Sequence, residues 1–182
     1  MERETHLVLR CQRGDPAAFA KLVEAYKKPI YNLAYRMLND REEANDITQD
    51  TFLRVYRHIE RYKPEHKFST WIYAIASRLC IDRLRKVKGN IQELDFNLPD
   101  NWPLPEEQVI QNQMRQDIDS AINRLPEKYR LVIVLRHLNE LSYEEIATAL
   151  EIPVNTVKTH LFRGREILKQ TLTKMKVGES HG

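Results

Sequence analysis

The 182-residue chain has few of the residues that support several common classes of protein. Its only cysteines, Cys11 and Cys80, lie far apart and form no Cys-x-x-Cys pair, so we expect a reduced, cytosolic setting with both thiols in the core. Five glycines and 30% charged residues disfavour a turn-rich β protein and favour long helices. No run of about 18 apolar residues is present, so direct membrane insertion is not expected. The charged start of the chain also lacks the apolar core of a secretory signal.

Motifs of several common catalytic sites are missing as well. The sequence has no Gly-rich phosphate loop, no His-Glu-x-x-His motif and no nucleophile elbow. We therefore expect no enzymatic activity, no cofactor, no catalytic residues and no metal site. A nucleic-acid enzyme that holds a metal on Asp46 and Asp50 stays a distant alternative, because both acids lie on one short helical stretch.

Charge is nearly balanced in total but not along the chain. The formal net charge of +3 by itself predicts no nucleic-acid partner. Residues 78–88 hold five basic residues and one acid, and residues 120–182 hold ten basic residues and seven acids. Residues 89–119 hold seven acids and one arginine. Two basic blocks therefore flank an acidic connector, and each block is a candidate for binding a polyanion.

Apolar residues recur three and four positions apart over the first part of the chain, which predicts helices. Gly14 indicates the end of a first short helix, and Asp15 followed by Pro16 indicates the capped start of a second. The apolar stripe of this second helix continues past Pro29. Since proline removes a helical hydrogen bond, we expect a kink there or a break just before it.

Two further helices are predicted before residue 90. Asp40 can cap the third, whose first turn carries acids where the helix dipole favours them. A polar loop follows, and Ser69 or Thr70 is expected to cap the fourth. We expect that helix to bury its apolar side chains, to carry basic residues in its last turns and to end at Gly89.

The helical pattern collapses between residues 89 and 105, where Asn, Asp and three prolines mark a linker. Helical spacing returns near residue 106, and Leu125-Pro126 separates two further helices. We therefore predict an all-α fold of two small helical domains, residues 1–88 and 106–182. A flexible acidic linker at residues 89–105 joins them, and the C-terminal domain is a helix-turn-helix.

Residues 142–165 carry the helix-turn-helix signal. Ser142-x-x-Glu145 is a capping box at the start of its first helix. Pro153 would stop that helix and Asn155 would cap the second. On the second helix the apolar stripe faces inward, and its outward side is rich in groups that contact phosphates or base edges. These outward residues are Thr156, Lys158, Thr159, Phe162 and Arg163, with His160 at the side.

The same pattern has a plainer interpretation, an ordinary pair of antiparallel helices with a solvated basic face. The turn length, the capping box and the basic cluster at the front of the second helix agree in favouring DNA binding. Residues 67–86 are weaker evidence. They combine aromatic and basic residues, which can stack on bases and hold phosphates, but Trp71 at helical spacing usually indicates core. The acidic stretch 45–50 beside Phe52 is either a solvated face or a docking surface for a basic protein.

The order of these segments resembles the extracytoplasmic-function sigma factors, the small two-domain members of the sigma-70 family. The resemblance covers residues 8–172, and each piece alone would be loose. The motifs that carry it, in chain order, are Gly14-Asp-x-x-Ala-Phe19, Tyr35-Arg-Met-Leu38, Glu43-Ala-x-Asp-Ile-x-Gln-Asp50, Phe68-Ser-Thr-Trp-Ile-Tyr73, Ile81-Asp82-Arg83, Leu125-Pro-Glu-Lys-Tyr-Arg130, Ser142-Tyr-Glu-Glu-Ile-Ala147 and Thr156-Val-Lys-Thr159.

The resemblance implies a transcription initiation factor that directs core RNA polymerase to promoters and helps to melt them. The β′ clamp helices of the polymerase would bind Asp46, Gln49, Asp50 and Phe52, and the second domain would touch the β flap. The −35 element would be read by Thr156, Lys158, Thr159, His160, Phe162, Arg163 and Arg165. The −10 element would be bound by Lys67, Phe68, Ser69, Thr70, Trp71, Arg78, Asp82, Arg83, Arg85 and Lys86. The resemblance also implies that the acidic linker threads towards the RNA exit path.

The resemblance further implies an anti-sigma factor that restrains the protein, so a cytoplasmic chain is expected, with the option of being held at the membrane by that partner. The sequence departs from the family pattern at Asn155, where Gly is more frequent, and at His160, where Arg is frequent. Arg78 and Asp82 lie where members vary, so the promoter letters stay open. The main alternative is a stand-alone dimeric helix-turn-helix regulator, which would bind duplex sites without polymerase.

Overall fold

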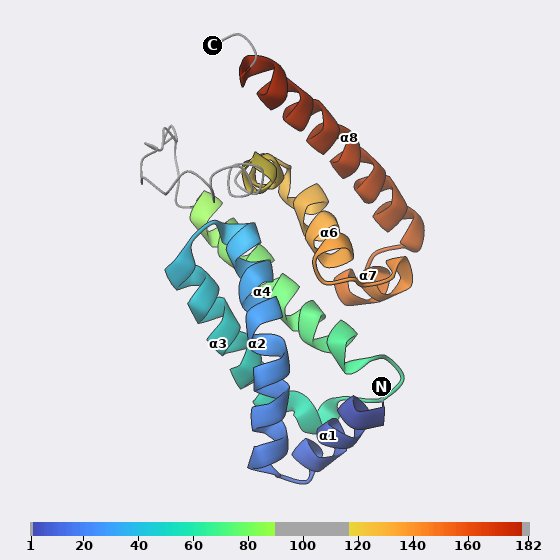
Figure 1. Cartoon of the computed structure of the whole chain (residues 1–182). Helices are drawn as coiled ribbons and strands as arrows, with labels where there is room; N and C mark the ends of the chain where they lie inside the picture. The colour runs from blue at the N-terminus through green and yellow to red at the C-terminus, as the bar shows by residue number, and fades with distance from the viewer. Residues whose placement is uncertain (1, 90–116, 180–182) are drawn as a thin grey trace.

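The computed structural model describes residues 2–89 and 117–179, and this part of the chain is helical, without strands (Figure 1). The predicted all-α fold of two small helical domains is thereby confirmed. The first domain consists of α1 (Glu2–Gln12), α2 (Pro16–Leu38), α3 (Arg41–His58), the 3-10 turn η1 (Ile59–Arg61) and α4 (Phe68–Gly89). The second contains helical residues 117–123 and then α6 (Glu127–His137), α7 (Tyr143–Leu150) and α8 (Val154–Glu179). Residues 90–105 of the predicted linker and the predicted domain start at 106 lie outside the described residues.

The turn between α1 and α2 forms as its sequence predicts. Asp15 accepts hydrogen bonds from the backbone N–H groups of Ala17 and Ala18, at 2.9 and 3.2 Å, and Pro16 occupies the first helical position. Gly14 has a φ of 82°, a left-handed conformation that glycine adopts without steric cost. Asp40 likewise caps α3 by accepting from the N–H of Glu43 at 2.9 Å.

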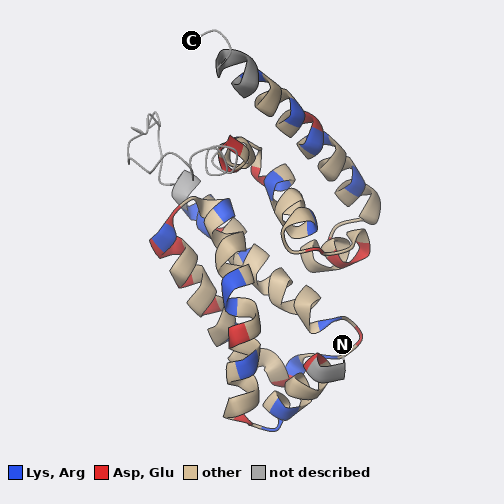
Figure 2. Cartoon of the chain, in the orientation of Figure 1, with Lys and Arg blue, Asp and Glu red and all other residues tan. Residues whose placement is uncertain are grey.

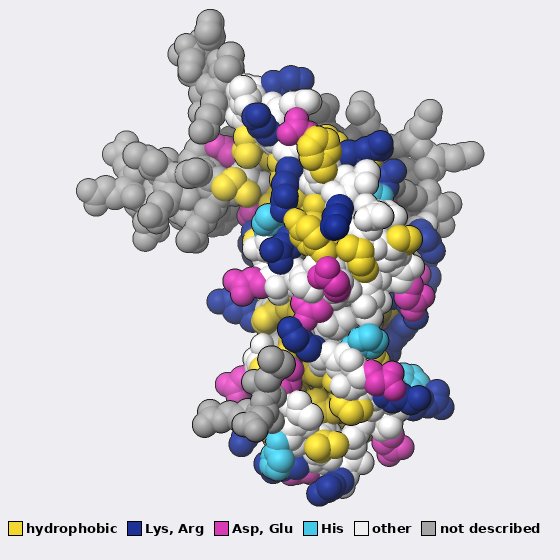
Figure 3. Space-filling view, turned by 90° about the vertical axis from the view of Figure 1, so that its right-hand side faces the viewer, with side chains coloured by type: hydrophobic (Ala, Val, Ile, Leu, Met, Phe, Trp, Pro, Cys, Tyr) yellow, Lys and Arg dark blue, Asp and Glu magenta, His cyan; other side chains and the backbone are white. Residues whose placement is uncertain are grey.

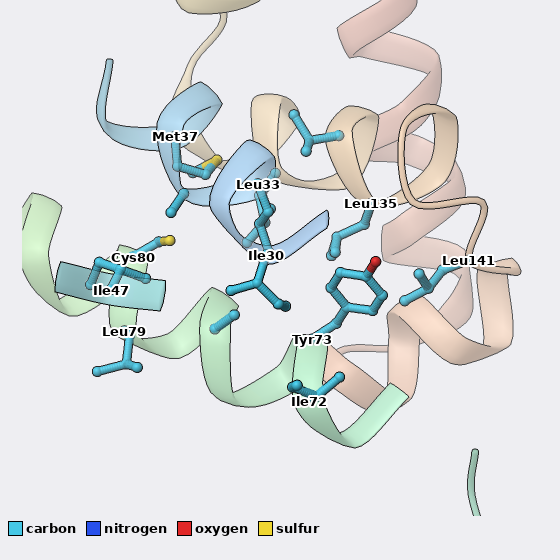
Figure 4. Packing of buried hydrophobic residues seen from close by; sticks show 14 of the residues in the cluster. Ile30, Leu33, Met37, Ile47, Ile72, Tyr73, Leu79, Cys80, Leu135 and Leu141 are labelled. Atoms are coloured by element: carbon cyan, nitrogen blue, oxygen red, sulfur yellow. The ribbon is translucent and has the colours of Figure 1, made fainter. Parts of the chain in front are cut away.

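Helix α2 runs through Pro29 without a break, so of the two predicted outcomes, a kink at this residue or a break just before it, the break does not occur. A proline inside a helix costs about 3 kcal/mol, and a buried aliphatic side chain stabilises by about 1.5–3 kcal/mol. Beyond the proline, Ile30, Leu33 and Met37 are almost fully buried, and Figure 4 shows them in one cluster with Ile47 of α3 and Cys80 of α4. Packing of the second half of α2 therefore outweighs the local cost.

Helix α4 begins at Phe68, so neither Ser69 nor Thr70 is its N-cap, as the sequence had suggested. The reason is aromatic packing. Phe68 is 2% exposed and meets the rings of Tyr26 and Tyr62 edge-on, at centroid distances of 5.5 and 5.8 Å. This cluster fixes Phe68 inside the domain and moves the helix start one residue earlier.

The helix-turn-helix forms with its predicted capping box. Ser142 accepts from the N–H of Glu145 at 3.1 Å, and the Glu145 carboxylate accepts from the N–H of Ser142 at 2.7 Å. Helix α8 starts at Val154, so Asn155 lies inside its first turn and is not the cap. The carbonyl of Pro153 instead accepts the first helical bonds, from Thr156 and Val157. Proline thus ends the turn and opens the helix.

A close crossing of α6 and α8 depends on Gly164. A Cβ atom at this position would lie 2.9 Å from a side-chain carbon of Ile133. Val157 and Leu161, on the same side of α8, are buried. The predicted inward stripe is therefore confirmed over the first turns of the helix.

The two domains pack against each other in the structure. Helix α4 lies beside α7, and α2 lies beside α6 (Figure 1). Tyr73 of α4 is 5% exposed and lies near Leu135 and Leu141 of the second domain (Figure 4), and its hydroxyl accepts from the amide of Asn139 at 2.9 Å. Arg130 donates to the carbonyl of Met37 across the same boundary at 2.9 Å. The relative placement of the domains was not predictable from the sequence.

Candidate nucleic-acid and protein interfaces

The front of α8 presents a mixed basic and apolar surface. Phe162 is 66% exposed, and Lys158, Thr159 and Arg163 are exposed on the same side of the helix. Figure 3 shows Lys and Arg side chains interspersed with hydrophobic ones on the upper part of the molecule, where α8 lies. Thr156 is partly buried. This side of α8 is complementary to a DNA groove, which offers phosphates, base edges and thymine methyl groups.

Contacts with α6 orient part of this surface. Arg163 donates to the hydroxyl of Tyr129 at 3.3 Å, and this hydrogen bond lowers the pKa of the tyrosine. The ring of His160 meets Tyr129 edge-on at a centroid distance of 5.4 Å. Burial, and then the charges of Lys128 and Arg163, lower the pKa of His160, so its ring is neutral at pH 7. Positive charge here therefore comes from Lys and Arg.

Arg165, the last residue predicted on this surface, points towards α6. Its guanidinium lies 3.3 Å from Nε2 of His137. Burial lowers the pKa of His137, and the neighbouring arginines lower it further. A neutral His137 ring can accept a hydrogen bond from Arg165. Arg165 is therefore directed towards α6 and lies apart from the exposed front formed by Lys158 and Arg163.

The face of α4 predicted for the −10 element is only partly at the surface. Phe68 and Thr70 are each 2% exposed, so in this arrangement the prediction that they contact DNA is not supported by their placement. Ser69 and Trp71 are half-buried, and the Trp71 ring packs against Tyr62 at 5.4 Å. The predicted residues that are exposed are Lys67, Arg78, Asp82, Arg85 and Lys86.

Arg83 differs from these exposed residues because it is tied into the first domain. It is half-buried and forms an ion pair with Glu43 of α3. The pair joins α3 to the C-terminal part of α4. Arg83 therefore holds the two helices together, and Arg85 and Lys86 are the exposed basic groups beside it.

Two of the exposed basic residues on this face meet acids of the second domain, one in α7 and one directly after it. Lys67 Nζ lies 2.7 Å from Glu145, and a guanidinium nitrogen of Arg78 lies 2.8 Å from Glu151. Burial opposes ionisation of Glu145, but the hydrogen bonds from Lys67 and from the Ser142 backbone outweigh it and lower its pKa. The hydrogen bond to Glu145 also raises the pKa of Lys67. Both pairs join the domains across the predicted −10 surface.

A small cavity of about 280 Å³ lies beside Glu151. The 61–66 segment, Thr70 and Trp71 line one side, and Thr148 and Ala149 of α7 line the other. The hydroxyl of Thr70 is buried there and has no hydrogen-bond partner within the described part of the chain. A buried hydroxyl without a partner is costly, so this cavity is suited to a ligand with polar groups.

The acidic face of α3 is at the surface, but one of its predicted members is not. Asp46, Gln49 and Asp50 are exposed, whereas Phe52 is 8% exposed and packs inside the domain. Leu53 is 52% exposed and follows Gln49 and Asp50 by four and three positions, so it shares their face. Helical spacing in the sequence could therefore have placed Leu53 on this face. The candidate docking surface is therefore an acidic face with one exposed apolar residue, which is Leu53 and not Phe52.

A basic row on the same helix had been missed. Arg54 and Arg57 of α3 and Arg61 of η1 are exposed. With Trp71 and Arg78 of α4 they line a pocket of about 580 Å³. The sequence holds these arginines at helical spacing, but the predicted loop after residue 60 separated Arg61 from the others.

Two findings concern metal binding and membrane insertion. Among residues 2–89 and 117–179, no group of three or more His, Cys, Asp or Glu side chains is placed to hold a metal ion. Within those same segments, no helix has both the length and the apolar character to span a membrane.

Comparison with known proteins matches both domains. A family model for sigma-70 region 2 covers residues 22–89, and one for sigma-70 region 4 covers residues 115–168. The extracytoplasmic-function RNA polymerase sigma factor SigW of Bacillus subtilis is 42% identical over 91% of this chain and 94% of its own length. The RNA polymerase sigma-H factor of Pseudomonas aeruginosa is 32% identical over 94% of each chain.

Solved structures support the fold. CnrH, in complex with the cytosolic domain of CnrY, matches 94% of this chain and 98% of its own with a TM-score of 0.74 at 21% identity. The sigma factor RpoE of Bartonella quintana, in complex with the anti-sigma factor NepR, matches 85% of this chain and 96% of its own with a TM-score of 0.67 at 20% identity. The arrangement of helices is thus shared beyond recognisable sequence similarity.

Proposed function

The chain belongs to the extracytoplasmic-function sigma factors of the sigma-70 family and is a transcription initiation factor, and from this premise we propose how its surfaces work. Core RNA polymerase binds the first domain, α8 reads the −35 element, and the α3–α4 region holds the melted −10 element. The observation that best supports this assignment is the exposed front of α8, where Phe162 lies among Lys158, Thr159 and Arg163. A stand-alone regulator is not favoured, because the relatives match over both domains.

At the −35 element, α8 enters the major groove with its N-terminal turns, as recognition helices do. Lys158 and Arg163 contact phosphates or guanine edges, and Thr159 and Phe162 meet thymine methyl groups. His160 is neutral at pH 7, so it contributes a hydrogen bond and no charge. Thr156 and Arg165 lie at the margin, since the first is partly buried and the second is turned towards His137.

At the −10 element, the cavity beside Trp71 receives an unstacked base. Extruding a base costs a few kcal/mol, which stacking on an aromatic side chain and hydrogen bonds can offset. The Thr70 hydroxyl, buried without a partner in the described part of the chain, becomes available for a hydrogen bond to the base once the cavity opens. Helix α7 lines the opposite side, so the second domain moves away before the base enters. Strand separation of this kind needs no hydrolytic site, and we propose that the protein is not an enzyme.

The polymerase docks on α3 through an acidic face with an apolar centre. Asp46, Gln49 and Asp50 suit the basic side chains of a protein partner, and Leu53 supplies an exposed apolar contact. By the family resemblance that partner is the pair of β′ clamp helices, while the second domain reaches the β flap. Since two structural relatives are complexes with partner domains or anti-sigma factors, an anti-sigma factor is also proposed for this chain, with a cytoplasmic location.

Runoff transcription tests the proposal directly. The chain should allow core RNA polymerase to start at a defined subset of promoters in a genomic library. A gel shift on one such promoter should give a stable complex only when core polymerase and the chain are both present. Tight binding of the duplex promoter by the chain alone, with no effect on initiation by core, would instead identify a stand-alone regulator.

A further inference from the structure

We propose that the pocket between α3 and α4 binds the backbone phosphates of single-stranded DNA beside the −10 element, and that Glu151 occupies this phosphate site as an internal anion while the domains are packed together. This inference rests on the proposed function, because the ligand is promoter DNA. It adds a binding site for phosphates and a competition between DNA and the second domain.

The phosphate site is defined by Arg54 and Arg57 of α3, Arg61 of η1 and Arg78 of α4. It encloses about 580 Å³, and the Trp71 ring forms part of its wall. Guanidinium groups bind phosphate with two parallel hydrogen bonds, and an aromatic ring beside them can stack on a base. The arrangement therefore suits a nucleotide chain better than an isolated carboxylate.

Most of this charge is uncompensated in the described part of the chain. Arg54, Arg57 and Arg61 form no ion pair or side-chain hydrogen bond there. The one acidic residue among those lining the pocket is Glu151, from the other domain. Several like charges gathered around one space repel one another, so an anion of higher charge should bind there.

Both the backbone conformation and the helix dipole disfavour a glutamate at position 151. Its φ is 55°, a left-handed conformation for which Gly or Asn is usual after a helix. It also follows the C-terminal end of α7, where the helix dipole disfavours a negative charge. Its side chain forms an ion pair with Arg78 at 2.8 Å. Figure 2 shows acidic positions on α7, the helix that faces α4.

The ion pair is readily displaced. Its side chains are 62% and 74% exposed for Arg78 and Glu151, and pairs this exposed are weak and screened by salt. Successive phosphates of a strand can engage several arginines at once, so DNA outcompetes one carboxylate. Because α7 also lines the base cavity, withdrawal of Glu151 opens the phosphate site and the cavity together.

The first test measures the competition. A fluorescein-labelled single-stranded deoxyoligonucleotide with the −10 region is titrated with the full-length chain and followed by anisotropy. Glu151→Gln removes the internal anion and should tighten binding several-fold. Glu144→Gln removes an exposed charge from α7, the helix that Glu151 follows, and should leave affinity unchanged. Equal affinity of Glu151→Gln and the natural chain, or binding by neither, overturns the proposal.

The second test identifies the phosphate contacts. The double variant Arg54→Gln, Arg57→Gln should weaken binding of the −10 oligonucleotide and of a scrambled one of equal length to the same extent. Each phosphate contact to a single strand contributes about 0.7 to the slope of log affinity against log salt, so the slope should fall by about 1.4. An unchanged slope overturns this inference alone. Loss of promoter-specific transcription by the natural chain with core would instead overturn the proposed function.

Discussion

Helix α8 presents Phe162 and Arg163 to solvent, whereas α4 turns Phe68 and Thr70 inward and has Arg78 paired with the other domain. Both helices are candidates for contacting DNA, and both were predicted from aromatic and basic residues at helical spacing. On α8 the buried stripe and the candidate contacts occupy opposite sides. On α4 the helix is covered by α2 and α3 within its own domain and by α7 of the second domain.

The difference lies in what a duplex and a single strand require. A groove of double-stranded DNA accepts a preformed helix face, so α8 can be ready before it meets DNA. An unstacked base needs a cavity, and a hydroxyl buried without a partner costs free energy that a hydrogen bond to the base can recover. Packing of α7 over Thr70 and Trp71 is therefore consistent with a site that opens only when the domains separate.

The largest effect is expected where the domains meet. Tyr73→Ala removes a nearly buried ring that lies near Leu135 and Leu141, and such truncations cost about 3–5 kcal/mol. Urea unfolding followed by circular dichroism should show this loss of unfolding free energy. Leu53→Ala, at a half-exposed position, should change it little. If both variants unfold alike, Tyr73 is not part of a shared core.

Recognition by α8 should be sensitive to one charged side chain. Arg163→Ala is expected to weaken binding to the −35 element by about 1–3 kcal/mol if the guanidinium meets a base edge. Competition gel shifts with holoenzyme on promoters that differ only in the −35 region measure this. Lys169→Ala, exposed farther along α8, is the matched control. A variant that keeps the natural −35 preference would show that α8 lies differently in the groove.

The acidic face of α3 should control assembly with polymerase. Asp50→Lys reverses a charge at the centre of this face and is expected to weaken association with core by about tenfold, or about 1.4 kcal/mol. Glu24→Lys makes the same change on the exposed side of α2 and should have no such effect. Analytical ultracentrifugation or surface plasmon resonance provides the affinities. Natural affinity for Asp50→Lys would remove this face from the proposal.

The smallest effect is the pH dependence of the Lys67–Glu145 pair. The folded-state pKa of Glu145 lies below its ordinary 4.5, so its contribution to domain packing is present above that pH and is lost as the pH falls through the lowered value. The pKa of Lys67 is raised above 10.5, so its contribution disappears only as the pH rises through the raised value.

Energy transfer between dyes on the two domains reports this packing. The signal should stay level between the two limits and fall on the acid side. In Glu145→Gln the acid-side change should shrink, whereas Glu144→Gln should keep it. An identical acid response in Glu145→Gln and the natural chain would assign the change to other carboxylates.

Much of the fold followed from local rules in the sequence. The caps at Asp15 and Asp40 and the capping box at Ser142 lie where predicted, because each depends on one side chain and the next two or three backbone N–H groups. The break considered before Pro29 and the cap predicted at Ser69 or Thr70 do not form, for one shared reason. At both places packing against other helices opposed a local preference and exceeded it in magnitude.

The candidate sites were predictable to different degrees. The outward side of α8 follows from helical periodicity alone, and Lys158 and Phe162 lie on it. Periodicity could also have distinguished exposed Leu53 from buried Phe52, since Leu53 shares the spacing of Asp50. The phosphate site could not be found in this way, because its residues come from two helices and a turn.

By itself, the sequence determined which segments become helices, where most of them begin, and which side of α8 faces outward, since these depend on neighbours within about four residues. Only the tertiary structure decided that Phe68 and Thr70 lie inside, that three arginines without an ion pair among the described residues surround one pocket, and that Glu151 reaches this pocket from the other domain. These contacts join residues that are distant along the chain. They depend on how the helices and domains pack, which no local pattern specifies.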